Sequence, residues 1–387
     1  MPKSKAQKKK STHSKLKDAL ASAKDLPLVS VSLFSGGGGL DIGVEDAGFK
    51  NLVSVEWDEN AVETLRYNAV RKGSVTRVIH ADIRTVDPLE IAQPGIDLLH
   101  GGPPCQAFSL IGKRDSLDDY RGLLLFEMIR FVKAIQPKAL LLEQVKGLLS
   151  APDERGEHGG VFRRFTSELG ELGYTVKWSV LCAADYGVPQ LRERVFIVAL
   201  RGPNGFFFPP PTHAAVPEET PLFKIKPYVG AGEVLGDLPP PVLKGQEATF
   251  PNHVDVTPDR DRERIHPVPE GSHLACQLHV PLSIRRNLSK KDTTKYRRLD
   301  RNEPSLTLRC GEIFFHPTED RYLTPRECMR LHGYPDEHIL CGPIRSRCGV
   351  ARNLDQHRQV ANSVPPPLGR VVAKQIAKAL LNERKNI

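Results

Sequence analysis

The chain has 387 residues, with 55 Lys and Arg against 46 Asp and Glu, which gives a formal net charge of +9. Because 40% of the residues are hydrophobic and 26% are charged, the composition is that of a globular protein and excludes a chain that is disordered throughout. No run approaches the roughly 18 apolar residues of a transmembrane helix, and the seven scattered Cys follow no signal peptide, so we expect no membrane partner and free thiols in a reducing compartment.

The first segment, residues 1–26, lacks apolar periodicity and is predicted to be a basic disordered tail. Its first 17 residues hold seven Lys and no acid, which leaves 48 basic and 46 acidic residues in the rest of the chain. Most of the net charge therefore lies outside the predicted core. Such a tail suits a polyanionic partner, although charge runs are equally often solvated surface.

From Leu28 onward, short apolar runs alternate with amphipathic stretches. Strands are predicted at 28–34, 51–56, 76–80, 96–100, 138–143 and 194–200. Helices are predicted in the stretch that ends at Ala47, at 59–70, at 122–135 and near 162–172. Strands that alternate with helices predict an α/β fold with a doubly wound, mostly parallel, Rossmann-like sheet.

This alternation ends near Gly202, where we place the boundary of a first domain, 27–202. The following residues carry Pro clusters and little periodicity, so they predict a second, smaller, loop-rich domain at 203–355. A last helix at 368–381 has an apolar stripe. We expect the C-terminal segment, 356–387, to pack back on the first domain.

Candidate binding groups follow three consecutive predicted strands. A Gly-rich turn at 35–39 gives a ligand close access to the backbone and to free N–H groups at a helix N-terminus, although a plain structural turn is the alternative. Glu56 and Trp57 end the second strand, where an acid can hold ribose hydroxyls and an indole can stack on adenine. Asp82 ends the third strand. These groups predict a nucleotide crevice at the carboxyl edge of the sheet.

The next strand ends lead to candidate reactive groups. Cys105 lies on a Gly- and Pro-rich loop after the fourth strand and is placed for attack, although a lone loop Cys usually has no role. Glu143 ends the fifth strand and can hold a proton in an apolar site. Arg192 and Arg194 bring two guanidinium groups to the start of the last strand, where surface salt bridges are the alternative reading.

The order of these motifs resembles that of the DNA (cytosine-5) methyltransferase family, of the bacterial restriction–modification type. The matching stretches are 34–49, Glu56-Trp57, Asp82, 102–106, Glu143, 185–194, 326–336 and 359–366, and together they cover roughly residues 28–382. The resemblance implies a methyltransferase sheet that binds S-adenosylmethionine, and a small domain that recognises double-stranded DNA. It also implies a monomer in the bacterial cytoplasm at the nucleoid, with a possible partner in a restriction endonuclease that acts on the same site.

The resemblance further implies a mechanism. The target cytosine leaves the duplex, the Cys105 thiolate adds to C6, Glu143 holds N3, and Arg192 holds the base carbonyl. The implied catalytic residues are Cys105, Glu143, Gln190, Arg192 and Arg194, and no metal is required. The implied cofactor contacts are Phe34, Gly36, Gly38, Leu40, Glu56, Trp57, Asp82, Ile83, Asn362 and Ser363.

The resemblance implies that residues at about 240–300 of this chain recognise the DNA sequence. The local stretch 285–309 holds nine basic residues and three acids. Lys and Arg there suit phosphate contacts, and some Arg suit guanine in the major groove. The expected DNA contacts are Ser109, Arg285, Arg286, Lys290, Lys291, Arg297 and Arg298. A zinc site built from the later Cys is rejected, because no two of them are closely spaced.

The chain differs from the family pattern at three positions: it has Gln144 where Asn is usual, Ala107 where Pro is usual, and Ala361 where Gly is usual. None removes the nucleophile, the acid or the cofactor acid, so we expect an active enzyme. Two rival readings remain. One is the tRNA-methylating branch of the same family, whose Cys-Phe-Thr stretch is missing here. The other is a non-catalytic DNA-binding relative, which only Gln144 supports.

Overall fold

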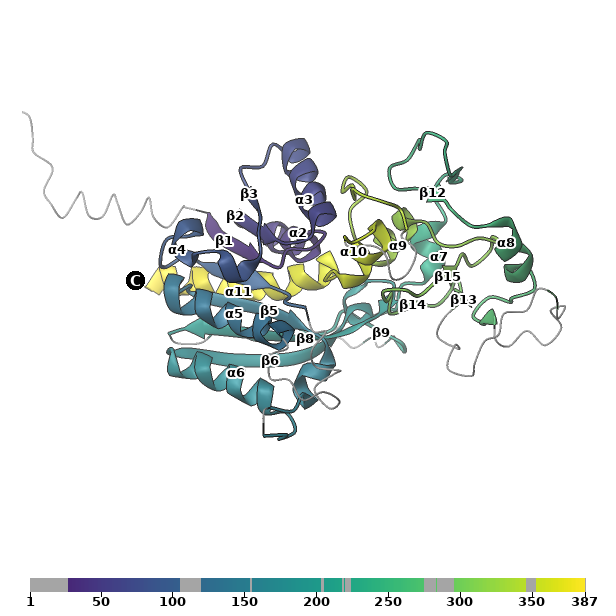
Figure 1. The fold of residues 1–387 in the computed structure, drawn as a ribbon. Coiled ribbons are helices and arrows are strands. Elements are labelled where there is room, and N and C mark those ends of the chain that lie inside the picture. The colour runs from purple at the N-terminus through teal and green to yellow at the C-terminus, as the bar shows by residue number, and fades with distance from the viewer. Residues whose placement is uncertain are drawn as a thin grey trace, which may run out of the picture.

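The computed structural model describes residues 27–104, 120–153, 155–202, 205–217, 219, 224–274, 283, 296–345 and 353–386. A seven-stranded sheet forms the larger lobe, and a lobe of short strands and helices lies beside it (Figure 1). No helix within these ranges is both long and apolar enough to cross a bilayer.

The first five strands of the large sheet are parallel. They are β1 (Leu28–Leu33), β2 (Phe49–Glu56), β3 (Arg77–His80), β4 (Leu98–Gly101) and β5 (Ala139–Gln144). The sheet order is β3-β2-β1-β4-β5-β8-β6, where β6 (Tyr174–Cys182) and β8 (Glu193–Arg201) form an antiparallel hairpin that pairs through β8 with β5. The predicted doubly wound, mostly parallel α/β sheet is therefore confirmed.

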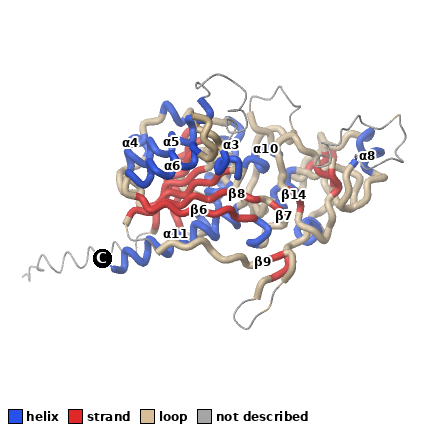
Figure 2. Tube along the Cα trace, turned by 90° about the horizontal axis from the view of Figure 1, so that it is seen from below, coloured by secondary structure: helices blue, strands red, loops and turns tan. Residues whose placement is uncertain are grey.

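Helices cover both faces of this sheet. On one face lie α4 (Pro88–Ile91), α5 (Tyr120–Ile135) and α6 (Gly160–Glu171), and on the other lies α11 (Pro366–Asn386), as Figure 2 shows. Met128, Phe131 and Phe165 are fully buried between α5, α6 and the first face. The remaining helices of this lobe are α2 (Gly39–Asp46) and α3 (Glu59–Lys72), and its short 3₁₀ turns are η1 (Ile83–Thr85), η2 (Lys146–Ser150) and η3 (Ala183–Tyr186).

The helix α11 is part of the core of the larger lobe, although it lies last in the chain. Leu368, Val372 and Ile376 are fully buried and pack with Leu40 and Val44 of α2 and with apolar side chains of the sheet. At its far end, the Arg384 guanidinium lies 3.0 Å from both carboxylate oxygens of Asp97, which is itself buried. The amphipathic stripe of the sequence is therefore the face that closes the core.

The smaller lobe has little regular structure. Its strands are β9 (His213–Ala214), β10 (Lys226–Pro227), β11 (Val242–Leu243), β12 (Val254–Asp255), β13 (Arg297–Arg298), β14 (Ser305–Leu306) and β15 (Phe314–Phe315). Its helices are α7 (Ala231–Leu235), α8 (Asp259–Ile265) and α9 (Pro325–Leu331), and α10 (Gln356–Asn362) leads from it to α11. The short strand β14 pairs with β7 (Gln190–Leu191), which precedes β8, so a β-ladder joins the two lobes.

The strand β6 was not predicted from the sequence. It lies at the edge of the sheet and pairs with one neighbour only. Only Tyr174 and Leu181 of its nine residues are buried, and Trp178 remains 47% exposed. Because the expected strands were continuous apolar runs, a half-exposed edge strand with Lys177 and Ser179 between its apolar residues did not match that pattern.

Candidate active site

The carboxyl ends of the parallel strands meet along one edge of the sheet, as predicted. The turn after β1 has Phe34 and Gly36 at positive φ, and Gly38 at φ +83° is the N-cap of α2. A Cβ atom on the next residue, Gly39, would lie 2.3 Å from the carbonyl oxygen of Val364. Glycine at this position therefore allows the turn to approach the segment between α10 and α11.

Glu56 holds the Gly-rich turn in place. Its carboxylate accepts hydrogen bonds from the backbone N–H groups of Gly36 at 2.7 Å, Trp57 at 3.0 Å and Asp58 at 2.8 Å. Burial raises the pKa of Glu56, while these N–H donors act against the rise. The two carboxylate oxygens offer about four acceptor positions, so a ribose hydroxyl can still be accommodated.

The other two strand ends differ in exposure. The Trp57 indole is 61% exposed and free to stack on a flat ring. The Asp82 carboxylate lies 3.0 Å from Nε of Arg84, and hydrogen bonding by Arg84 lowers the pKa of Asp82. The Ile83 side chain, in contrast, is only 4% exposed and packs in the core, and a contact between Ile83 and the cofactor stays a prediction.

One pocket brings together most of the other expected cofactor residues. It is lined by Phe34, Gly36, Leu40, Asn362 and Ser363, and also by Gly102 and Glu143. Residues from the first and last parts of the chain thus form one cavity that reaches the predicted catalytic acid. Gly38 does not line this pocket and is the N-cap residue of α2, and its contact with the cofactor stays a prediction.

Glu143 and Arg194 form the reactive end of the site. Glu143 is 8% exposed, and its Oε1 lies 3.0 Å from Nε of Arg194. Burial raises the pKa of the Glu143 carboxyl, and the neighbouring Arg194 and Arg192 charges oppose the rise. A Cβ atom on Gly102 would lie 3.2 Å from Oε2 of Glu143. The carboxyl group therefore lies against the start of the loop that carries Cys105.

Cys105 and Ser109 themselves lie outside the described residues, so the predicted nucleophile is placed only through its neighbours. Gln144 is buried, and its amide Nε2 donates a hydrogen bond to the carbonyl oxygen of Pro103. Its Oε1 accepts from the backbone N–H of Val145 at 3.1 Å. The longer amide found here in place of Asn thus reaches the loop two residues before Cys105.

Arg192 is not placed to hold a base carbonyl, which corrects the sequence-based expectation. It is 1% exposed, and its guanidinium donates to the backbone carbonyls of Leu308 at 3.1 Å, Ala361 at 2.9 Å and Ser363 at 2.8 Å. Gln190 is likewise fully buried and bonds to the protein interior. Arg194 is therefore the arginine that lies against Glu143.

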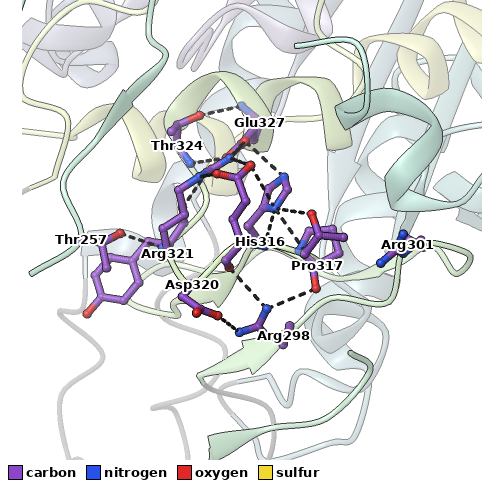
Figure 3. Close-up of polar contacts among 12 residues, drawn as sticks. Thr257, Arg298, Arg301, His316, Pro317, Asp320, Arg321, Thr324 and Glu327 are labelled. Atoms are coloured by element: carbon purple, nitrogen blue, oxygen red, sulfur yellow. Dashed lines mark hydrogen bonds and ion pairs between the residues drawn. The ribbon is translucent and has the colours of Figure 1, made fainter. Parts of the chain in front are cut away.

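Two of the expected DNA-binding arginines have structural contacts. Arg298 is 5% exposed and donates to the carbonyl oxygen of Ile265 at 2.9 Å and to Asp320 at 2.5 Å; Figure 3 shows it pointing toward Asp320. Arg297 donates to the carbonyl oxygen of Gly271 at 2.7 Å. Because its guanidinium is already paired inside the lobe, Arg298 is corrected from a DNA contact to a structural residue. Arg285, Arg286, Lys290 and Lys291 lie outside the described residues.

A second pair in the same lobe shows how buried charges are satisfied there. Arg321 donates to both carboxylate oxygens of Glu327, at 2.8 and 2.7 Å, and both side chains are almost completely buried (Figure 3). Glu327 also accepts from the backbone N–H of Thr324 and so completes a capping box at the start of α9. These charges hold the lobe together and are not free to contact DNA.

Sequence reasoning missed three buried polar residues around the pocket. Asp41 accepts from Ser32 Oγ at 2.6 Å beneath the Gly-rich turn, and burial raises its pKa to about 6. His332 and Tyr334 contact Ser363, at 2.9 Å to its carbonyl and 2.6 Å to its hydroxyl. Both lie inside the family-like stretch 326–336, so their position in that motif was the available signal. No group of three or more metal-ligating side chains occurs within the described ranges.

Comparisons with known proteins identify the family of the chain. The family model of the C-5 cytosine-specific DNA methylases matches residues 28–378. The chain belongs to this family. Type II methyltransferase M.NgoFVII of Neisseria gonorrhoeae is 34% identical over 354 residues, which cover 90% of this chain and 85% of the relative. Type II methyltransferase M1.HphI of Haemophilus parahaemolyticus is 32% identical over 92% of this chain and 89% of its own length.

Solved structures show the same fold. A prophage-encoded E. coli structure described as a DNA modification methyltransferase superposes with a TM-score of 0.64 at 23% identity, over 91% of this chain and 99% of the other. The Entamoeba histolytica methyltransferase EhMeth gives a TM-score of 0.58 at 14% identity, over 93% of this chain. The protein is thus a DNA (cytosine-5) methyltransferase, and its methyl donor is S-adenosylmethionine.

Proposed function

We propose that the protein methylates C5 of a flipped-out cytosine within a specific DNA sequence, through a covalent bond to Cys105. One observation carries the proposal: the pocket lined by Phe34, Asn362 and Ser363 is also lined by Glu143, which lies beside Arg194 and Gly102. A buried acid therefore adjoins both the expected cofactor position and the loop that leads to Cys105. The target base leaves the helix because C5 and C6 are covered by stacking within the duplex.

Bound S-adenosylmethionine supplies an electrophilic methyl group. The residues that fit it are the Gly-rich turn, the Glu56 carboxylate for the ribose hydroxyls, the exposed Trp57 for the adenine ring and Asp82 for the adenine amino group. Support comes from the contacts already described: three backbone donors orient Glu56, Trp57 is exposed, and Asp82 is held ionised by Arg84. These residues are proposed contacts.

The protein residues then act on the base. The Cys105 thiolate forms a bond to C6, while Glu143 hydrogen-bonds or protonates N3, so that electron density moves to C5. The electron pair at C5 forms the bond to the methyl group, and the pair of the broken sulfur–methyl bond would stay with the donor sulfur. C5 then loses its proton to solvent. The electron pair of the C5–H bond then re-forms the C5–C6 double bond and expels the Cys105 thiolate, which releases 5-methylcytosine. Burial raises the pKa of Glu143, which favours the protonated carboxyl group that can donate to N3.

We assign the base carbonyl to Arg194. Its side chain is largely buried, and its Nε already contacts Glu143, so the guanidinium lies beside the acid that would hold N3 of the same ring. In a pyrimidine, N3 and the carbonyl oxygen at C2 are neighbours. Glu143 and Arg194 together can therefore bind the edge of cytosine that carries N3 and the C2 carbonyl oxygen.

Sequence recognition is proposed for the second lobe, with Arg285, Arg286, Lys290 and Lys291 as phosphate or base contacts and Ser109 as a contact on the catalytic loop. A protective role in a restriction–modification system, with a cognate endonuclease, is supported by the relatives, which are named Type II methyltransferases. We propose that the enzyme acts as a monomer at the bacterial nucleoid.

A labelled-methyl transfer assay on mixed DNA and tRNA tests the proposal. Label in DNA, followed by bisulfite sequencing of DNA from a host that expresses the chain, is expected to identify one short methylated sequence. Label in tRNA alone would refute the DNA substrate. If neither the DNA nor the tRNA became labelled, the result would favour a non-catalytic DNA-binding relative.

Two substitutions test the chemistry. Cys105→Ser is expected to abolish turnover and to leave cofactor affinity within a few-fold; a variant that still methylates would overturn the nucleophile assignment. Glu143→Gln is expected to slow methyl transfer far more than it weakens DNA binding. Glu193→Gln is the matched control, because Glu193 is an exposed acid next to Arg194 and pairs with Lys146 at the surface.

A further inference from the structure

The backbone that closes the cofactor pocket is held by buried side chains from two other parts of the chain. The segment 361–363 contributes Asn362 and Ser363 to the pocket wall. Arg192 donates to the carbonyl oxygens of Ala361 and Ser363 at 2.9 and 2.8 Å. His332 reaches the same Ser363 carbonyl from the end of α9, at 2.9 Å from its Nε2. Two donors thus meet on one carbonyl group of the pocket wall.

The same guanidinium also holds the second lobe. Its Nη1 donates to the carbonyl oxygen of Leu308, in the segment through which the chain leaves the recognition region. Next to it, Gln190 accepts from the backbone N–H of Leu308 at 3.2 Å, and Thr307 donates to the carbonyl oxygen of Leu191 at 2.7 Å. Arg192 therefore stands at the junction of three chain segments that are more than 50 residues apart in sequence.

The His332 ring is present in one tautomer. Burial lowers its pKa well below the ordinary value, so the ring is neutral. A carbonyl oxygen can only accept, so Nε2 carries the proton, and Nδ1 accepts from the Gln190 amide at 3.0 Å. Gln190, His332 and the Ser363 carbonyl therefore form an ordered chain of hydrogen bonds with one direction.

We propose that Arg192 and His332 are positioning residues, which fix the pocket wall at 361–363 and tie it to the segment at Leu308 where the recognition lobe returns. The proposal rests on the cofactor site of the proposed function and departs from the usual expectation that an arginine here contacts the base. Removing a charged donor from buried carbonyl groups costs free energy, because each carbonyl oxygen is then left without a hydrogen-bond donor in a site that excludes water. Without this clamp, the wall is free to move away from the cofactor.

Cofactor affinity measured without DNA tests the clamp, because a residue that contacts only the flipped base has no role in that experiment. Isothermal titration of the full-length protein with S-adenosylmethionine is expected to show a dissociation constant about tenfold higher for Arg192→Lys, which keeps the charge but loses the planar fork. Arg194→Lys is the matched comparison and is expected to keep the wild-type dissociation constant while it loses turnover. A purely stabilising role would reduce the number of binding sites and leave the dissociation constant unchanged.

A second pair of variants decides the case if Arg192→Lys does not fold. Asn at position 332 can replace Nδ1 but cannot reach Ser363, whereas Gln can place an N–H near the position of Nε2. His332→Asn is expected to weaken cofactor binding about tenfold, and His332→Gln to stay within about twofold of the wild type. Wild-type cofactor affinity in both Arg192→Lys and His332→Asn would overturn the proposal. Loss of methyl transfer with normal cofactor binding would instead bear on the catalytic assignments.

Discussion

Replacing Gly39 by alanine tests the contact between α2 and the segment after α10. The added Cβ would lie 2.0 Å from Ser363 Oγ and 2.3 Å from the carbonyl oxygen of Val364. The serine hydroxyl can rotate away, but the carbonyl belongs to a backbone that Arg192 and His332 hold. We therefore take the upper end of the cost of overpacking, about 3 kcal/mol, and subtract about 1 kcal/mol for the better helix propensity of alanine.

The expected net loss is about 2 kcal/mol in the free energy of unfolding, with weaker cofactor binding because the pocket wall is displaced. Urea denaturation followed by circular dichroism measures the first effect, and calorimetric titration measures the second. Gly170→Ala in α6 is the matched control, since that glycine has open space at its Cβ position and the same substitution should stabilise the protein. A Gly39→Ala variant as stable as Gly170→Ala would refute the packing argument.

Three further outcomes are expected. Gln144→Ala leaves the Pro103 carbonyl without its amide donor and should slow turnover about tenfold with cofactor affinity unchanged, as measured by single-turnover methylation. Burial raises the pKa of Asp41 from 3.8 to about 6, so between these pH values the folded protein keeps a proton that the unfolded chain has lost. The free energy of unfolding should therefore fall by about 3 kcal/mol as the pH rises from about 4 to 6. In urea titrations, Asp41→Asn should remove this pH dependence. Arg384→Ala removes two bonds to the buried Asp97 and should cost about 2 kcal/mol of stability in the same assay.

Each of these expectations has its own control and its own contrary result. Gln144→Asn retains a shorter amide and should fall between the wild type and the alanine variant; equal rates in all three would mean that the amide does not support the loop. A wild-type pH profile in Asp41→Asn would show that another group carries the protons. Arg163→Ala removes an exposed pair with Glu157 and should change stability by less than about 0.5 kcal/mol, so an equal loss in both arginine variants would contradict the role of burial.

The parallel sheet and its site edge were predictable because they depend on local patterns. Buried parallel strands are continuous apolar runs, and the residues that follow them lie at one edge, which placed Glu56 and Glu143 correctly before any contact was known. Directions of side chains were harder to predict. Arg192 lies at the break between β7 and β8, where strand alternation no longer indicates which way a side chain points, and its three acceptors come from residues 308–363.

Charge composition was the weakest guide. The basic stretch that contains Arg298 suggested a surface for DNA, but Asp320, more than twenty residues further along the chain, neutralises Arg298 inside the lobe. Such pairings depend on tertiary contacts between distant residues, which a local pattern in the sequence does not contain.

The position of α11 has a consequence for synthesis of the protein. The ribosome makes the five parallel strands first and the smaller lobe next, and it adds α11 only after both. Until Leu368, Val372 and Ile376 emerge, one face of the sheet is without the helix that covers it, and the wall at 361–363 is missing from the pocket. The nascent chain therefore cannot complete this pocket before the smaller lobe has been synthesised, so the methyl-donor site is among the last parts of the protein to form.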